Sequence, residues 1–234
     1  MTDFLKTEAS GEEQWISVSD MMAGLMMIFL FISIIYIQNI SKYFSAVADK
    51  SDEICAQLKR EFEKESDSWD MSICENGLLI SFDSESNFER NSSVLSRDFE
   101  LILSDFYPRL MAVIYEYKDS VSELRIEGHT DSSVRRLDSE LSGYLYNTRL
   151  SQERSLNVMR YSLNLEDITL QPKYLNWSYT HVTAHGMSSS KRIFSDSGDE
   201  DYAASRRVEF RLRTKAEDRL LDLVSEIRSG GTER

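Results

Sequence analysis

One uninterrupted apolar stretch most constrains how this chain can fold. Every residue of Met21–Ile37 is apolar or small except Ser33 and Tyr36, and the stretch extends back to Ile16. About 20 consecutive apolar residues are enough to cross the hydrocarbon core of a bilayer as a helix. The sequence therefore predicts a single transmembrane helix, to which we assign residues 15–38.

An uncleaved anchor explains this stretch better than a cleavable signal peptide. The segment Ala46-Val47-Ala48 has the small-x-small form of a cleavage site but lies well beyond Ile37, and MTDFLKTEASGEEQ, which precedes the stretch, has one Lys among four acids. A signal peptide has a shorter apolar region and a positively charged start. We expect residues 1–14 to be a short tail on the cytoplasmic side.

The charges beside the helix favour the opposite topology. Before the helix stands Lys6, and after it stand Lys42, Lys50, Lys59 and Arg60. The positive-inside rule would keep the more basic side, and with it the C-terminal domain, in the cytoplasm.

Composition excludes one class of function and leaves the cysteines open. The formal net charge is -13 and the basic residues are scattered among acids, which argues against nucleic-acid binding, since that needs clustered Lys and Arg. The two cysteines, Cys55 and Cys74, lack CxxC spacing and a partner set for zinc. They pair with each other in an oxidising compartment, or Cys55 pairs with its copy in a dimer, or both are free thiols.

Residues 39–70 are predicted to form a helical or coiled-coil linker. Apolar and small side chains recur at alternating spacings of four and three, the seam of a short parallel coiled coil, at Ile40, Phe44, Val47, Ser51, Ile54 and Leu58. This pattern favours a homodimer. A single amphipathic helix lying on the membrane or on the following domain has the same spacing.

The chain beyond the linker has the pattern of a small α+β domain. Strand-like runs occur in ICENGLLISFDSESNFERNSSVLS and SELRIEGHTD, and helical spacing occurs in Phe99–Tyr117, where Pro108 interrupts it, and in Asn147–Leu163. We expect WSYTHVTAHG and SRRVEFRLR as further strands, and His129 in a turn. The order predicts a mixed sheet with helices packed on one face.

Three ordered motifs carry a family resemblance. The stretches IEGHTD (Ile126–Asp131), NTRLSQERS (Asn147–Ser155) and SRRVEFRL (Ser205–Leu212) resemble the signatures of the OmpA-like peptidoglycan-binding domain. We assign residues 71–215 to that domain, and 216–234 to a C-terminal helix and tail. The insertion SSVRRLDSELSGYLY between the first two motifs is longer than the family usually has.

The resemblance implies a ligand pocket. A peptidoglycan stem peptide offers an amine beside a carboxylate at its diaminopimelate end. Asp131 would accept from the ammonium and Arg154 would grip the carboxylate. By carry-over from the family, Asn147 and Leu150 complete the pocket, and Tyr146 is a wall. No enzymatic activity, cofactor or metal is expected.

The apolar helix resembles the ion-carrying helix of MotB-type stator subunits, especially the ZorB type of the Zorya antiphage system. Asp20 stands at its mouth, in SDMMAGLMMIFLFI. From the residues alone, Asp20 is either a cap at the membrane boundary or a functional ionisable group. The resemblance implies the latter, an ion carrier facing a multi-spanning ZorA- or MotA-like partner that forms a ring. A flagellar stator subunit and a passive wall-binding anchor are the alternatives.

Overall fold

The computed structural model describes residues 4–75, 77–83, 87–89, 92–133 and 139–230. They form two compact units, Met1–Ala46 and Val47–Arg234. Helix α1 (Phe4–Phe62) contributes to both units. Within the described residues, α1 contains one stretch long and apolar enough to cross a membrane, Val18–Lys42, with a mean hydropathy of 2.2.

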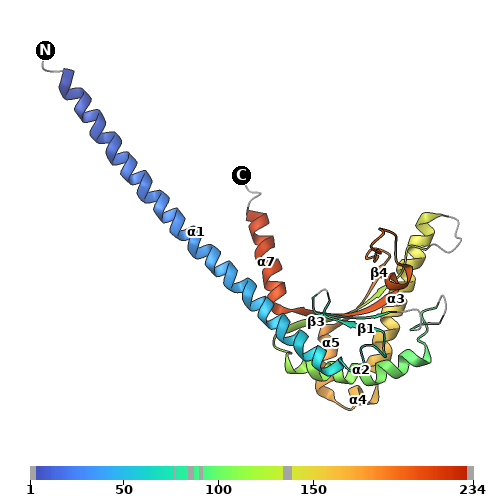
Figure 1. Ribbon diagram of the computed structural model, residues 1–234. Coiled ribbons are helices and arrows are strands. Elements are labelled where there is room, and N and C mark those ends of the chain that lie inside the picture. The colour runs from blue at the N-terminus through green and yellow to red at the C-terminus, as the bar shows by residue number, and fades with distance from the viewer. Residues whose placement is uncertain (1–3, 76, 84–86, 90–91, 134–138, 231–234) are drawn as a thin grey trace. The chain divides into compact units, whose positions relative to one another are not determined.

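A five-stranded mixed sheet organises the second unit (Figure 1). Its spatial order is β1-β2-β5-β3-β4, with β3 and β4 parallel and every other neighbouring pair antiparallel. The strands are β1 (Met71–Ile73), β2 (Leu79–Asp83), β3 (Val121–His129), β4 (Val182–Ser188) and β5 (Arg207–Thr214).

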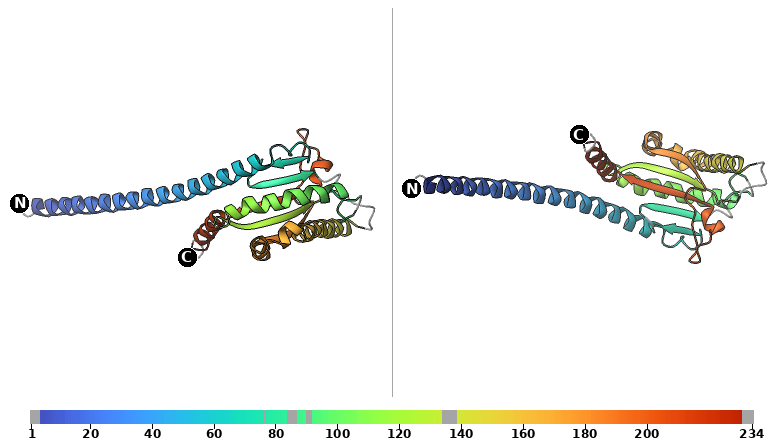
Figure 2. Two further views of the ribbon diagram at one scale, coloured as in Figure 1. Left: turned by 90° about the horizontal axis from the view of Figure 1, so that it is seen from below. Right: turned by 90° about the horizontal axis from the view of Figure 1, so that it is seen from above.

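Helices α2, α3 and α5 lie on one face of this sheet, and the two views of Figure 2 show the sheet from its helical and its open side. This confirms the expected mixed sheet with helices packed on one face. The helices of the second unit after α1 are α2 (Arg97–Glu116), α3 (Glu140–Leu163), α4 (Glu166–Thr169), α5 (Pro172–His181), α6 (Tyr202–Ser205) and α7 (Lys215–Gly230).

Alternation along the strands builds the core. In β5, Val208, Phe210 and Leu212 are buried toward the helices, while the residues between them face the open side, as the period of two requires. The Phe106 ring of α2 lies 5.0 Å from Phe210 and 4.9 Å from Phe82 of β2, in the edge-to-face arrangement that aromatic side chains favour.

The C-terminal part of α1 is built into this core. Ile54, Leu58 and Phe62 are 1%, 0% and 0% exposed. Arg109 of α2 donates to the Glu61 carboxylate at 2.7 Å, and its guanidinium carbon lies 4.9 Å from the centre of the Phe62 ring. The compact unit thus begins at Val47, within the segment that the sequence suggests is a linker. Two seam positions, Ile54 and Leu58, face their own domain, as the single amphipathic helix predicts.

Of the three fates open to the cysteines, the structure adopts the intramolecular one. Cys55 of α1 and Cys74, just after β1, form a disulfide with their Cα atoms 6.0 Å apart, within the usual range for such a bond. The bond ties the end of α1 to the first strand.

Three local expectations need correction. The segment WSYTH is the end of α5 and not a strand, because Pro172 starts a helix whose Tyr174, Trp177 and Ser178 are buried at helical spacing. The helix α2 continues through Pro108. His129 ends strand β3 and does not lie in a turn.

The insertion also carries more helix than expected. Within SSVRRLDSELSGYLY, α3 begins at Glu140, capped by the Ser139 side chain, which accepts from the Ser142 N–H. Part of the insertion, residues 134–138, lies outside the described residues.

Candidate functional site: a charged pocket at the end of β3

The residues expected to bind peptidoglycan gather where β3 ends beside α3. Asn147, Leu150 and Arg154 are spaced by three and four along α3 and therefore share one face of it. Asp131 follows β3, where the Thr130 N–H donates to the Ser188 carbonyl at 3.0 Å. The loop after β3 and one face of α3 thus form the two sides of the site.

Small residues let the helix approach the sheet closely enough to make this site. A Cβ at Gly128 would overlap the Ser151 carbonyl, and one at Gly186 would overlap the backbone of Gln152. The Ser151 hydroxyl accepts from the Ser188 N–H at 3.0 Å. This close approach of α3 to β3 and β4 is what glycine permits and any larger residue obstructs.

Asp131 is buried, 5% exposed, and most of its hydrogen-bonding capacity is used. Its Oδ1 accepts from the Ser133 N–H at 2.9 Å and from the Ser133 hydroxyl. Its Oδ2 accepts from Nη1 of Arg206 at 2.6 Å. The carboxylate that the sequence suggests will receive an ammonium therefore already holds a guanidinium.

Arg154, in contrast, has hydrogen-bond donors that no described residue uses. It is 7% exposed; its Nε donates to the Ser92 carbonyl at 3.1 Å and its guanidinium carbon lies 4.7 Å from the centre of the Phe88 ring. Among the described residues, neither terminal nitrogen of Arg154 has a hydrogen-bond acceptor or a carboxylate partner. A guanidinium with donors to spare can accept an anionic ligand through charge-assisted hydrogen bonds.

The other predicted residues support this pair. Asn147 is buried, and its side-chain amide donates to the carbonyls of Asp131 and Ser133 at 3.2 and 3.5 Å, so it shapes the loop that carries Asp131. Tyr146 and Leu150 are half-buried on α3 beside these groups.

The charged groups around Arg154 change the pKa of its guanidinium. Burial, chiefly, lowers the pKa of Arg154; the positive charge of Arg206 lowers it further, while Tyr146 and Asp131 oppose this. Two guanidinium groups thus share the site with one carboxylate.

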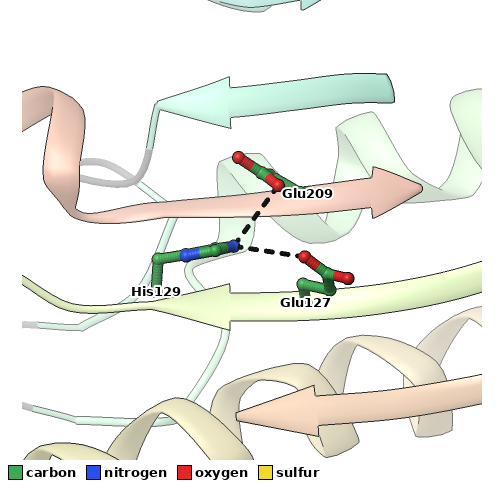
Figure 3. A group of neighbouring side chains, drawn as sticks. All are labelled: Glu127, His129 and Glu209. Atoms are coloured by element: carbon green, nitrogen blue, oxygen red, sulfur yellow. Dashed lines mark ion pairs between the residues drawn. The ribbon is translucent and has the colours of Figure 1, made fainter. Parts of the chain in front are cut away.

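A second cluster, formed by His129, Glu127 and Glu209 of the neighbouring strands β3 and β5, lies on the open face of the sheet (Figure 3). Nε2 of His129 lies 3.4 Å from Oε2 of Glu209 and 3.7 Å from Oε2 of Glu127. All three side chains are buried, 1%, 3% and 5% exposed, and their ligand-type atoms lie within 4.8 Å of one another.

The same spacing would suit a metal ion, but the neighbouring cations fit an ion-pair cluster better. Arg207 donates to Glu209 Oε1 at 2.6 Å and Arg211 to Glu209 Oε2 at 2.9 Å, while Arg211 also lies 3.4 Å from Glu127. Two arginines already balance the two carboxylates, so a dication would add uncompensated buried charge. Burial raises the pKa of Glu209, but the contact with His129 and the charges of His129 and Arg207 outweigh it and lower that pKa to about 2.

Arg206 is the site residue that sequence reasoning missed. It is the first Arg of SRRVEF, and its neighbour Arg207 serves the buried cluster. Because successive residues at a strand end point in opposite directions, the paired arginines signal two different roles. Nothing in the sequence signals that the first reaches Asp131, 75 residues away.

Asp20 lies in the other compact unit. It is an exposed residue of α1, close to the start of the apolar stretch Val18–Lys42. Its expected role as an ion carrier therefore concerns a site separate from the pocket of the second unit.

Comparison with solved structures shows which fold the second unit has. The structure of a MotB-like protein from Desulfovibrio vulgaris superposes with a TM-score of 0.51 and 20% identity, over 73% of this chain and 98% of that one. The periplasmic domain of Helicobacter pylori MotB gives a TM-score of 0.43 and 18% identity, over 70% and 92% of the two chains. No family model matches the chain. The match to the Desulfovibrio vulgaris structure shows that the second unit has the fold of the MotB-like, OmpA-like domains.

The chain belongs to the ZorB family. It is 35% identical over 222 residues to the Zorya protein ZorB of Escherichia coli. The alignment covers 92% of this chain and 93% of that protein. Family membership confirms the expectation of a stator- or anchor-type protein that is not an enzyme. The single apolar helix and the domain fold fit a single-pass inner-membrane protein.

Proposed function

We propose that this chain is the peptidoglycan-anchored, stator-type subunit of an ion-driven motor complex of the inner membrane that acts in antiphage defence. In this proposal the pocket of the second unit holds the cell wall, and Asp20 carries the translocated cation. The proposal rests on the ZorB family and on one observation above all: the buried Arg154 guanidinium, whose terminal nitrogens lack partners among the described residues.

The chemistry of the pocket supports a stem-peptide ligand. The unpartnered end of Arg154 suits a carboxylate, and the Asp131 carboxylate beside it suits the neighbouring ammonium of diaminopimelate. Leu150 and Tyr146 would pack against the aliphatic part of the ligand.

The proposal places the N-terminus in the cytoplasm and the second unit in the periplasm. The Cys55–Cys74 disulfide supports this topology, because such bonds persist in oxidising compartments. The distribution of Lys and Arg around the helix opposes it. The disulfide and the proposed wall-binding function both call for a periplasmic second unit.

A carboxylate within a membrane helix is costly and persists where it serves a pathway. One helix forms no channel by itself, so a multi-spanning ZorA-like partner ring must supply the facing wall, and a homodimer would present two Asp20 carboxylates to it. Each cation that crosses a potential of 100 mV supplies about 2.3 kcal/mol.

The variant Asp20→Asn tests the motor proposal. The amide keeps the volume of the side chain but neither loses a proton nor carries charge, so the complex should assemble normally and lose phage protection. Asp52→Asn, an exposed acid on the same helix outside the apolar stretch, is the matched control and should protect fully. The measurements are plaque counts and the yield of co-purified partner.

Full protection by Asp20→Asn with normal assembly would contradict the motor role. It would leave the passive wall-binding anchor as the better account, with Asp20 a helix-boundary residue for which Asn is an equally good cap.

A further inference from the structure

Among the described residues, the site brings together two guanidinium groups and one carboxylate, those of Arg154, Arg206 and Asp131. A carboxylate has about four lone-pair positions for hydrogen bonds, and Asp131 uses three of them, two toward Ser133 and one toward Arg206. Arg154 contributes a second guanidinium, whose terminal nitrogens have no acceptor among the described residues. Within the described part of the chain, the terminal nitrogens of Arg154 are therefore the donors that remain for an anionic ligand.

Arg206 is held at Asp131 by the loop that precedes it. Glu200 accepts from the Ser132 N–H at 2.9 Å and from the Ser132 hydroxyl, which fixes this loop next to Asp131. Asp201 then caps the short helix α6 by accepting from the N–H groups of Ala203 and Ala204, each at 3.0 Å. Arg206 follows this helix directly, so its position is set before a ligand binds.

Arg207, the residue after Arg206, anchors the backbone on the other side. Arg207 donates to Glu209 at 2.6 Å and to the Lys191 carbonyl at 3.0 Å. The backbone that carries Arg206 is therefore anchored on both sides, at a position from which its side chain reaches Asp131.

We propose that Arg206 is a specificity-determining residue of the wall-binding pocket. Because Arg206 occupies Asp131, the pocket selects its ligand by a free carboxylate and only secondarily by an ammonium. This inference rests on the proposed wall-binding function. A stem peptide binds through its carboxylate on Arg154, while its ammonium must either use the remaining lone pair of Asp131 or displace Arg206. A wall whose diaminopimelate carboxylate is amidated would bind poorly.

Competition by small molecules distinguishes the contribution of the ligand's carboxylate to binding from that of its ammonium. The full-length protein in detergent is bound to purified sacculi and challenged with diaminopimelate, with pimelate, which has the carboxylates without the amines, and with cadaverine, which has amines alone. We expect pimelate to displace the protein within about tenfold of the diaminopimelate concentration, and cadaverine to need at least about tenfold more than pimelate.

The variant Arg206→Gln should change this ranking. With Asp131 released, cadaverine should compete about tenfold better than it does with the unaltered protein, whereas Arg206→Lys should keep the original order. Arg149→Gln, an exposed arginine of α3 paired with Glu153, is the matched control and should leave all three concentrations unchanged.

Each result decides the inference. Equal competition by cadaverine and pimelate against the unaltered protein would overturn it while leaving wall binding intact, and this comparison needs no variant to fold. An unchanged ranking in a folded Arg206→Gln protein, checked by circular dichroism, would also overturn it. Absence of binding to sacculi would instead refute the proposed function itself, and with it this inference.

Discussion

Nη1 of Arg206 lies 2.6 Å from Oδ2 of Asp131, although the two residues are 75 positions apart in the chain. The pair joins the start of β5 to the loop after β3, and it brings a guanidinium to the carboxylate that the motif GHTD contributes. Arg154 approaches the same carboxylate from α3 closely enough for the charges of Asp131 and Arg206 to act on it. Arg206 thus binds Asp131, and in our proposal Arg154 binds the ligand.

Arg154→Lys should abolish most wall binding while keeping the positive charge. An ammonium is a point charge and cannot offer a carboxylate two parallel donors, so we expect retention on sacculi to fall at least about tenfold. A pull-down with purified sacculi measures this.

The choice of Lys matters because Arg154 is also packed against Phe88. Arg154→Ala would remove that packing and lower stability as well, which would confuse loss of contact with loss of fold. Retention equal to that of the unaltered protein in Arg154→Lys would show that the pocket binds without bidentate recognition.

The buried cluster should make the domain sensitive to acid. Because the folded pKa of Glu209 is lowered from 4.5 to about 2, its contribution to stability is complete above pH 4.5 and is lost as the pH falls toward 2. The urea midpoint should therefore drop across this range.

Glu209→Gln should remove about 3 kcal/mol at neutral pH, because it leaves the buried Arg207 without its carboxylate partner and Arg211 with Glu127 alone. It should also flatten the acid dependence. Glu153→Gln is the control, since Glu153 belongs to the exposed pair with Arg149. An unchanged pH profile in Glu209→Gln would assign the acid sensitivity to other groups.

Gly128→Ala should destabilise the domain by about 2 kcal/mol, since the added methyl group overlaps the Ser151 carbonyl, which belongs to rigid helical backbone. Thermal unfolding of the second unit measures the loss. Gly24→Ala, where an added Cβ has no atom within 4 Å, should leave that transition in place. A normal melting temperature for Gly128→Ala would mean that α3 can move away from β3.

The state of Cys55 and Cys74 in living cells tests the topology. If the second unit is periplasmic, thiol alkylation of acid-quenched cells should modify neither cysteine until a reductant is added. Cys55→Ser should lower stability by about 3 kcal/mol, because the bond closes a segment with a sequence separation of 19 residues. Complete alkylation without reductant would instead place the domain in the cytoplasm, as the distribution of Lys and Arg suggests.

Patterns that depend on one element could be predicted from the sequence, and relationships between elements could not. The alternation in SRRVEFRLR gives β5, and the apolar run gives the membrane stretch. In contrast, WSYTH combines β-favouring residues with the burial pattern of a helix, and Pro172 decides the outcome.

The linker shows the same limit. Spacings of three and four describe both a coiled-coil seam and a helix that packs on its own domain, and only the position of the partner surface separates them. Here Ile54 and Leu58 find that surface within their own chain. Similarly, the motifs predict that Asp131, Asn147 and Arg154 meet, but the ion pair that already occupies Asp131 depends on tertiary placement alone.

The seating of α1 in the core has a mechanical consequence. Val47–Phe62 is continuous helix held by Ile54, Leu58 and Phe62, by the Arg109 guanidinium and by a covalent bond at Cys55. A load applied to this part of the helix is spread as shear over the buried side chains of the second unit and is shared by the disulfide. In the motor that we propose, this seating would keep the domain still while the partner turns.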